Sequence, residues 1–261
     1  ISLLKKIKPS IILDHASICM VQESWQFPKK YYDINVKSRF DIIAELSNKK
    51  FLKKKIYIST PEIFGSSKNK IKEKFSTFNP STPYAASKLL AEINFKHALV
   101  SKKFPLIISR FSNFYGPGQP LYRLIPKALI SLKKKLSFPL HGNGNSKRNF
   151  IYTDDFCEGI NRMITKGSIG NIYHFSGDKY VSIKEIIKII CRLKKVKFNK
   201  FVKITQDRTG KDNFYKLNSS FTKKKLDWKC KTDIEKGIKK TLEFYDNNYK
   251  SLSSQPLNYK L

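Results

Sequence analysis

The sequence alternates short apolar runs with longer stretches whose apolar residues recur at helical spacing. In one of the longer stretches, Val36, Phe40, Ile43 and Leu46 follow one another three or four residues apart. The alternating segments are 11–17, 33–46, 55–59, 84–100 and 105–110. Strands that alternate with helices form parallel sheets, because each helix carries the chain back across a face of the sheet. The sequence therefore predicts an α/β fold.

The second half of the chain adds further expected elements. They are helices over 122–133 and 153–165 and a strand over 172–176. Two pairs have capping-box spacing, Ser182 with Glu185 and Thr232 with Glu235, and predict the starts of two more helices. A chain of 261 residues with 40% hydrophobic content suffices for one sizeable core, or for one domain with a smaller lobe.

The net charge of +32 raises the question of a nucleic-acid partner. Only seven of the 52 basic residues are arginine. The lysine runs at 53–55, 133–135 and 223–225 lack the interleaved aromatic residues and arginine of a nucleic-acid surface. We therefore interpret most of the charge as solvated surface and expect no specific nucleic-acid partner. The charge would still attract anionic substrates.

Cysteine, histidine and apolar patterns bear on compartment and metal content. The four cysteines lack C-x-x-C spacing and the histidines at 97, 141 and 174 lack metal-ligand spacing. No apolar run approaches the roughly 18 residues of a membrane span. We expect a cytoplasmic protein with reduced cysteines, no membrane span and no metal. The cysteines are Cys19, Cys157, Cys191 and Cys230.

Tyr84 and Lys88 are the strongest candidates for chemistry. Four residues apart, they share one face of the predicted helix. A nearby ammonium lowers the pKa of a phenol, so Tyr84 could act as a base near neutral pH. Such pairs also occur on ordinary helix surfaces, so the neighbouring motifs decide. Those motifs lie at 56–60, 61–65, 79–83, 109–119, 148–154 and 208–212.

In this order the motifs resemble the extended short-chain dehydrogenase/reductase family, the NAD-dependent epimerases and dehydratases. Within it they are most similar to nucleotide-sugar 4,6-dehydratases of the dTDP-glucose type. The resemblance implies a Rossmann-like parallel sheet with a smaller C-terminal α/β lobe that binds the substrate. It places the NAD-binding part at 1–120 and the nucleotide-sugar lobe mainly at 121–261, with the strand at 172–176 returning to the first part.

The family normally opens with a strand, a glycine-rich turn and a helix that bind the cofactor pyrophosphate. No G-x-x-G-x-x-G or G-x-G-x-x-G motif occurs in the sequence. We therefore expect the sheet to be N-terminally incomplete and the main cofactor fingerprint to be missing. This expectation bears directly on whether the polypeptide is active.

The resemblance assigns catalytic roles to Thr60, Glu62, Tyr84 and Lys88. NAD takes a hydride from C4 of the sugar while Tyr84 removes the C4 hydroxyl proton. Lys88 lowers the pKa of Tyr84 and binds the nicotinamide ribose, and Thr60 holds the sugar O4. Glu62 is the expected base for C5, but Pro61 stands where these dehydratases carry an acidic proton donor.

The remaining matches concern binding. On the cofactor side the resemblance implies His15, Ser59 and Ser112, together with Tyr84 and Lys88. For the nucleotide sugar it implies Asn113, Arg123, Arg148 and Arg208; the planar, permanently charged arginine side chain suits a diphosphate. Asp154 and Asp155 are expected to cap a helix rather than to catalyse.

The predicted function is conversion of a nucleoside-diphosphate hexose to its 4-keto-6-deoxy form with loss of water. A 4-epimerase is one alternative, disfavoured by Glu62, and a nucleotide-uronate decarboxylase is another, disfavoured by Gln119. A non-enzyme alternative is an inactive remnant of the fold or a basic nucleic-acid-binding protein. The resemblance also implies a homodimer formed through the helix that carries Tyr84 and the long helix before it.

Overall fold

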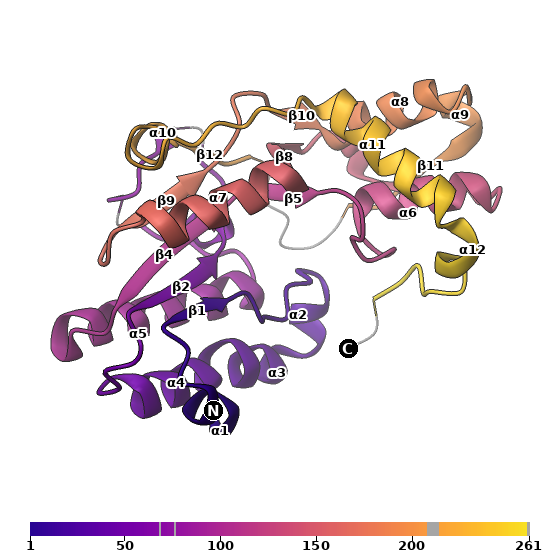
Figure 1. Cartoon of the computed structure of the whole chain (residues 1–261). Coiled ribbons are helices and arrows are strands. Elements are labelled where there is room, and N and C mark those ends of the chain that lie inside the picture. The colour runs from indigo at the N-terminus through magenta and orange to yellow at the C-terminus, as the bar shows by residue number, and fades with distance from the viewer. Residues whose placement is uncertain (68, 76, 208–213, 260–261) are drawn as a thin grey trace. The chain divides into compact units, whose positions relative to one another are not determined.

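The computed structural model describes residues 1–261 except 68, 76, 208–213 and 260–261. The chain forms two compact units (Figure 1). The first unit comprises Ile1–Ser112, Cys157–Ser176 and Gly210–Lys229, and the second comprises Asn113–Phe156, Gly177–Thr209 and Cys230–Leu261. The chain therefore passes between the units several times.

A four-stranded parallel sheet forms the centre of the first unit (Figure 1). Its strands, in spatial order, are β1 (Ile11–Asp14), β2 (Lys54–Ser59), β4 (Leu106–Phe111) and β9 (Ile172–Phe175). Residues of β2 and β4 are almost wholly buried, as expected for strands covered on both faces. The α/β class and the parallel sheet are thus confirmed.

Helices cover this sheet. Those of the first unit are α1 (Ser2–Ile7), α2 (Glu23–Gln26), α3 (Pro28–Tyr32), the π-helical turn η1 (Asp33–Lys37), α4 (Ser38–Leu46), the 3₁₀ turn η2 (Pro61–Phe64), α5 (Pro83–Lys102) and α10 (Ser220–Leu226). The short strands β3 (Lys70–Ile71) and β12 (Lys216–Leu217) pair in parallel. Leu46, Phe95 and Phe104 from the helical side pack against Tyr57 and Leu106 of the sheet.

The inward face of the helical segment 33–46 differs from the predicted one. Phe40 is 52% exposed, whereas Asn35 and Arg39 are buried together with Ile43. Near the N-terminal end of this segment, the residues that face the core are therefore at positions 35 and 39, one position before the predicted 36 and 40. Polar side chains occupy the buried positions there, so hydrophobic spacing could not reveal the true face.

The second unit mixes short strands and helices. It contains β5 (Asn113–Tyr115), α6 (Leu124–Lys133), β6 (Phe138–His141), η3 (Gly142–Gly144), β7 (Lys147–Arg148), β8 (Phe150–Tyr152), β10 (Val181–Ser182), α8 (Ile183–Leu193), α9 (Phe198–Phe201), β11 (Val202–Thr205), α11 (Ile234–Asn247) and α12 (Tyr249–Leu252). Helix α7 (Thr153–Lys166) begins in this unit and continues in the first. The core of the second unit joins Leu129, Tyr152, Ile187 and Ile238 from four of these elements.

The two predicted capping boxes have different outcomes. Ser182 caps α8 by accepting from the Glu185 backbone N–H at 3.1 Å, and the Glu185 carboxylate accepts from the Ser182 N–H at 2.6 Å. The second box is wrong by one residue, because Asp233, not Thr232, is the N-cap of α11. The Asp233 carboxylate accepts from two backbone N–H groups, which a threonine hydroxyl does less well.

Among the described residues, no helix is long and apolar enough to cross a membrane. The same part of the chain contains no group of three or more His, Cys, Asp or Glu side chains that could hold a metal ion. All four cysteines are free.

Candidate active site

The candidate site lies where strands β1, β2 and β4 end. The carboxyl ends of parallel strands open along one edge of the sheet, where α/β proteins bind their ligands. His15 and Ser17 follow β1, Thr60 follows β2 and Ser112 follows β4. The register Leu13 to Ile56 and Ser59 to Arg110 aligns these three strand ends. Residues predicted for cofactor contact therefore share one edge.

A single tight turn connects Thr60 and Glu62. Thr60 is the N-cap of η2, and its hydroxyl accepts from the Glu62 backbone N–H at 3.3 Å. Pro61 occupies the first position of the turn, where its missing N–H costs no hydrogen bond. Gly65 ends the turn at a φ of 62°, and a Cβ there would lie 2.2 Å from the Asn79 carbonyl oxygen. The half-buried Glu62 is thus fixed close to Thr60.

Helix α5 presents Tyr84 and Lys88 to the same edge. The helix starts with Thr82, whose hydroxyl accepts from the Ala85 N–H at 3.1 Å, and Pro83 occupies its first turn. Both Tyr84 and Lys88 are buried. The Thr60 hydroxyl and the Glu62 carboxylate are both near enough to act on the Tyr84 phenol electrostatically. The structure therefore groups Thr60, Glu62 and Tyr84.

The pKa of Tyr84 moves in the direction opposite to the prediction. Burial raises it well above its ordinary value, the charge of Glu62 adds to that rise, and the Thr60 hydroxyl lowers it only in part. The Lys88 side chain donates to Ser17 Oγ at 3.0 Å and to the Ile58 carbonyl at 2.6 Å. Burial, and then the charge of Arg39, lower the pKa of Lys88 to about 7.

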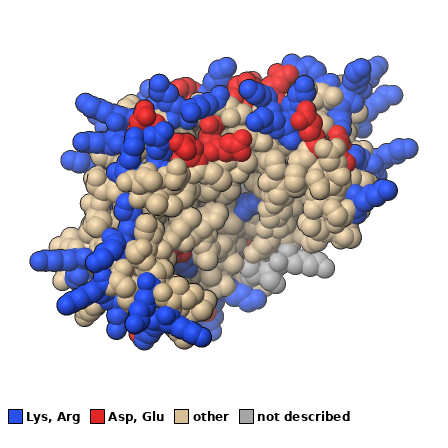
Figure 2. Space-filling view, viewed as in Figure 1, with Lys and Arg blue, Asp and Glu red and all other residues tan. Residues whose placement is uncertain are grey.

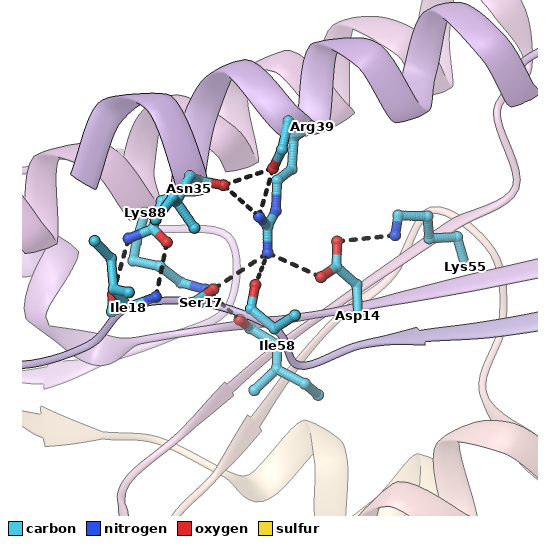
Figure 3. A network of polar contacts seen from close by, with 11 residues as sticks. Asp14, Ser17, Ile18, Asn35, Arg39, Lys55, Ile58 and Lys88 are labelled. Atoms are coloured by element: carbon cyan, nitrogen blue, oxygen red, sulfur yellow. Dashed lines mark hydrogen bonds and ion pairs between the residues drawn. The ribbon is translucent and has the colours of Figure 1, made fainter. Parts of the chain in front are cut away.

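A buried ion network beside Lys88 was not predicted from the sequence (Figure 3). Asp14 Oδ1 accepts from Arg39 Nη2 at 2.9 Å, and Asp14 Oδ2 accepts from Lys55 Nζ at 2.9 Å. All three side chains are buried. One signal was available: Asp14 and Lys55 are charged residues within apolar strands, where an unpaired charge is very unfavourable. Arg39, the second cation that pairs with Asp14, lies too far along the chain to be paired with it by inspection.

A second buried network joins α5 to the sheet. Arg110 of β4 donates to both carboxylate oxygens of Glu92, at 2.9 and 2.6 Å, and lies 3.0 Å from the His174 ring nitrogen. Burial, followed by the Arg110 charge, keeps the pKa of His174 well below its usual value. Glu92 lies four residues after Lys88, so this network continues the buried face of α5. Its role is to attach that helix to β4.

The remaining cofactor candidates lie at the strand ends. Ser59 and Ser112 are buried, and Ser112 Oγ has no hydrogen-bond partner among the described residues. The Ser112 N–H donates to the Phe175 carbonyl at 2.9 Å, which fixes the end of β4. Partial burial and the Lys88 charge lower the pKa of His15.

The predicted substrate residues belong to the second unit. Asn113 begins β5, Arg123 is the N-cap of α6 with its guanidinium 5.6 Å from the Tyr122 ring centre, and Arg148 in β7 donates to the Lys147 carbonyl at 2.9 Å. Arg208 lies outside the described residues.

Asp155 lies in the first turn of α7, directly after Asp154. Its carboxylate accepts from the backbone N–H groups of Lys231 and Thr232 at 3.1 and 2.9 Å. It therefore fixes the loop before α11. Asp154 is exposed and lies 3.7 Å from Lys240 Nζ.

A known protein family and several of its members match this chain. Residues 1–241 match the family described as GDP-mannose 4,6 dehydratase. The dTDP-D-glucose 4,6-dehydratase of Mus musculus is 32% identical over 247 residues, which is 93% of this chain and 69% of the relative. The corresponding protein of Dictyostelium discoideum is 30% identical over 291 residues, 95% of this chain and 67% of the relative.

Solved structures agree with these relatives. A dTDP-glucose 4,6-dehydratase of Streptomyces venezuelae with NAD bound superposes with a TM-score of 0.90 at 25% identity, covering 96% of this chain and 78% of that one. A UDP-glucuronic acid 4-epimerase of Bacillus cereus has a TM-score of 0.88 at 21% identity over 95% of this chain and 78% of that one, and shows the fold alone. The chain therefore belongs to the GDP-mannose 4,6 dehydratase family, among the epimerases and dehydratases of the extended short-chain dehydrogenase/reductases.

Proposed function

We propose that this chain carries the catalytic residues of an NAD-dependent nucleotide-sugar 4,6-dehydratase, which converts a nucleoside-diphosphate hexose to the 4-keto-6-deoxy sugar with loss of water. The observation that carries the proposal is the grouping of the Thr60 hydroxyl and the Glu62 carboxylate against the buried Tyr84. The named relatives are dTDP-glucose 4,6-dehydratases, which supports this reaction class.

Tyr84 acts on the C4 hydroxyl of the sugar. Its oxygen accepts the hydroxyl proton while the Thr60 hydroxyl, which lies near the phenol, orients the exchange. Because burial keeps Tyr84 protonated at neutral pH, the phenol must give up its own proton before its oxygen can accept another. Lys88, with a pKa of about 7, is partly neutral at that pH, and its amine takes the phenol proton, which leaves a Tyr84 phenolate and a Lys88 ammonium.

Glu62 acts on C5. A 4-keto group acidifies the neighbouring C5–H bond, and a carboxylate beside it can remove that proton. Pro61 has no proton to give, so within the turn Pro61–Phe64 only Glu62 can return the proton to the leaving C6 hydroxyl. The two steps together release one water molecule.

The strand ends fit NAD as cofactor. When bound, NAD would supply the hydride acceptor for C4 and then the hydride donor for C6, with a proton returning to C5. Ser112 Oγ, a buried hydroxyl without a described partner, and the Lys88 amine are donors of the kind that hold ribose and carboxamide groups. His15 and Ser59 lie at the same edge. Relatives crystallised with NAD support the assignment.

We assign Asn113, Arg123 and Arg148 to the nucleotide sugar, with Arg208 as a fourth candidate. Arginine binds diphosphate oxygens through two parallel hydrogen bonds.

On the face shown in Figure 2, Lys and Arg side chains project from many separate places, which supports solvated charge rather than one nucleic-acid surface. A cytoplasmic location remains a prediction from the cysteine pattern.

Incubation of the chain with NAD and dTDP-glucose is expected to give a product lighter by one water molecule, detected by mass spectrometry. The variant Glu62→Gln keeps the size of the side chain but removes the base. It is expected to lose between about 10²- and 10⁴-fold in dehydration rate. A product of unchanged mass with inverted C4 would instead identify a 4-epimerase and overturn the dehydratase proposal.

We also propose a homodimer formed through α4 and α5. Phe40 and Leu90 on these helices are 52% and 41% exposed, so both are accessible to a partner that packs against the two helices. The double variant Phe40→Glu with Leu90→Glu is expected to sediment as a monomer where the unmodified chain sediments as a dimer. Ile169→Glu, at a 51% exposed apolar position outside α4 and α5, is the matched control and should leave the mass unchanged. A monomeric unmodified chain would refute the proposal.

A further inference from the structure

Ser17 connects two buried cations beside the candidate site (Figure 3). Its hydroxyl oxygen accepts from Lys88 Nζ at 3.0 Å and lies 3.3 Å from Arg39 Nη2, which also donates to it. Arg39 Nη2 donates in addition to the Ala16 carbonyl. The loop that follows β1 is therefore held by Arg39 at the point where it receives the Lys88 ammonium.

Arg39 is itself held rigidly. Asp14 Oδ1 accepts from Nη2 at 2.9 Å, and the Ile34 carbonyl accepts from Nη1 at 2.6 Å. Lys55 pairs with the other oxygen of Asp14. Arg39 is 3% exposed and Lys55 is fully buried, so water does not screen these charges as it would at the surface.

We propose that Arg39, fixed by Asp14, is a positioning residue for Lys88, which it controls through the shared Ser17 hydroxyl and through its own buried charge. This inference rests on the proposed function, in which the neutral Lys88 amine takes the proton from Tyr84 and so prepares the phenol oxygen as a base. Arg39 would then set the pH at which that base becomes available.

The charges around Lys88 give the direction of the effect. Arg39 from α4 lowers the pKa of Lys88, whereas Asp14 from β1, Cys19 from the following loop and Glu92 from α5 raise it. The centre of the Tyr57 ring lies 4.3 Å from Lys88 Nζ, and the Lys88 charge lowers the pKa of His15. Loss of the Arg39 charge should therefore raise the pKa of Lys88 and move the acidic limb of the rate profile to higher pH.

The test is a direct titration of Lys88 by NMR of chains labelled with ¹³C at the lysine ε-carbon. The Lys88 signal is the one that is missing from Lys88→Met. In Arg39→Met the Lys88 pKa is expected to rise by about 1 unit or more. Arg39→Lys keeps the charge and should shift it less. Arg192→Met, which removes one exposed positive charge, should not shift it.

Ser17→Ala provides a shift of opposite sign. The hydroxyl stabilises the charged amine, so its loss should lower the pKa of Lys88. Arg39→Gln, which retains an amide donor, replaces Arg39→Met if the latter does not fold. Equal Lys88 titration in the unmodified chain and in the neutral Arg39 variants would overturn the inference. Since the titration needs no turnover, absence of dehydratase activity would refute the proposed function without affecting this result.

Discussion

Tyr84→Phe is expected to lower kcat for nucleotide-sugar conversion by between about 10²- and 10⁴-fold with little change in KM. The variant removes only the phenol oxygen that accepts the C4 hydroxyl proton. The ring keeps its edge contact with Tyr31, whose centroid lies 6.3 Å away, so the helix should hold its position. The rate is measured as formation of the 4-keto product under saturating sugar and NAD.

Tyr57→Phe is the matched control for this experiment. Tyr57 is fully buried, and its hydroxyl has no hydrogen-bond partner among the described residues. Its loss should leave kcat within about threefold of the unmodified chain, because it changes neither a proton acceptor nor a hydrogen bond. A Tyr84→Phe variant that retained full activity, or a Tyr57→Phe variant that lost as much, would refute the assignment of Tyr84 as the base.

The sheet could be predicted because its determinants are local. Strands β2 and β4 are buried on both faces and therefore appear as continuous apolar runs, and the helices between them have clear periodicity. Thr60, Glu62, Tyr84 and Lys88 were found because they fall within short motifs. The grouping of Thr60, Glu62 and Tyr84 then follows from the parallel order of strand and helix.

What the sequence did not reveal depends on contacts between distant segments. Asp14 and Arg39 are 25 residues apart, and each is uninformative without the other. The buried position of Arg39 also explains why the apolar stripe through Phe40 was assigned to the wrong face. The pKa of Tyr84 was predicted from its spacing to Lys88, but the dominant contribution is burial, which spacing does not report.

Arg110→Met is expected to lower the free energy of unfolding by about 3 to 5 kcal/mol, more than any of the other single substitutions named above. The substitution leaves the Glu92 carboxylate buried, and among the described residues Lys96, at 3.8 Å, is then its one charged partner. Burial opposes ionisation of Glu92, yet the Arg110 charge and hydrogen bonds hold its pKa below the usual value. The loss is measured by urea unfolding at neutral pH, followed by circular dichroism.

The double variant Glu92→Leu with Arg110→Met separates the cost of an unpaired charge from the value of the pair. Removing both partners leaves no buried charge, so the double variant should be more stable than Arg110→Met alone. Arg192→Met, which breaks an exposed ion pair, should cost less than about 1 kcal/mol.

Because the folded pKa of Glu92 is depressed, its stabilising contribution is present at neutral pH and is lost as the pH falls through that folded pKa. The stability difference between the unmodified chain and the double variant should therefore shrink on acidification, and a difference independent of pH would show that Glu92 and Arg110 contribute through packing rather than charge.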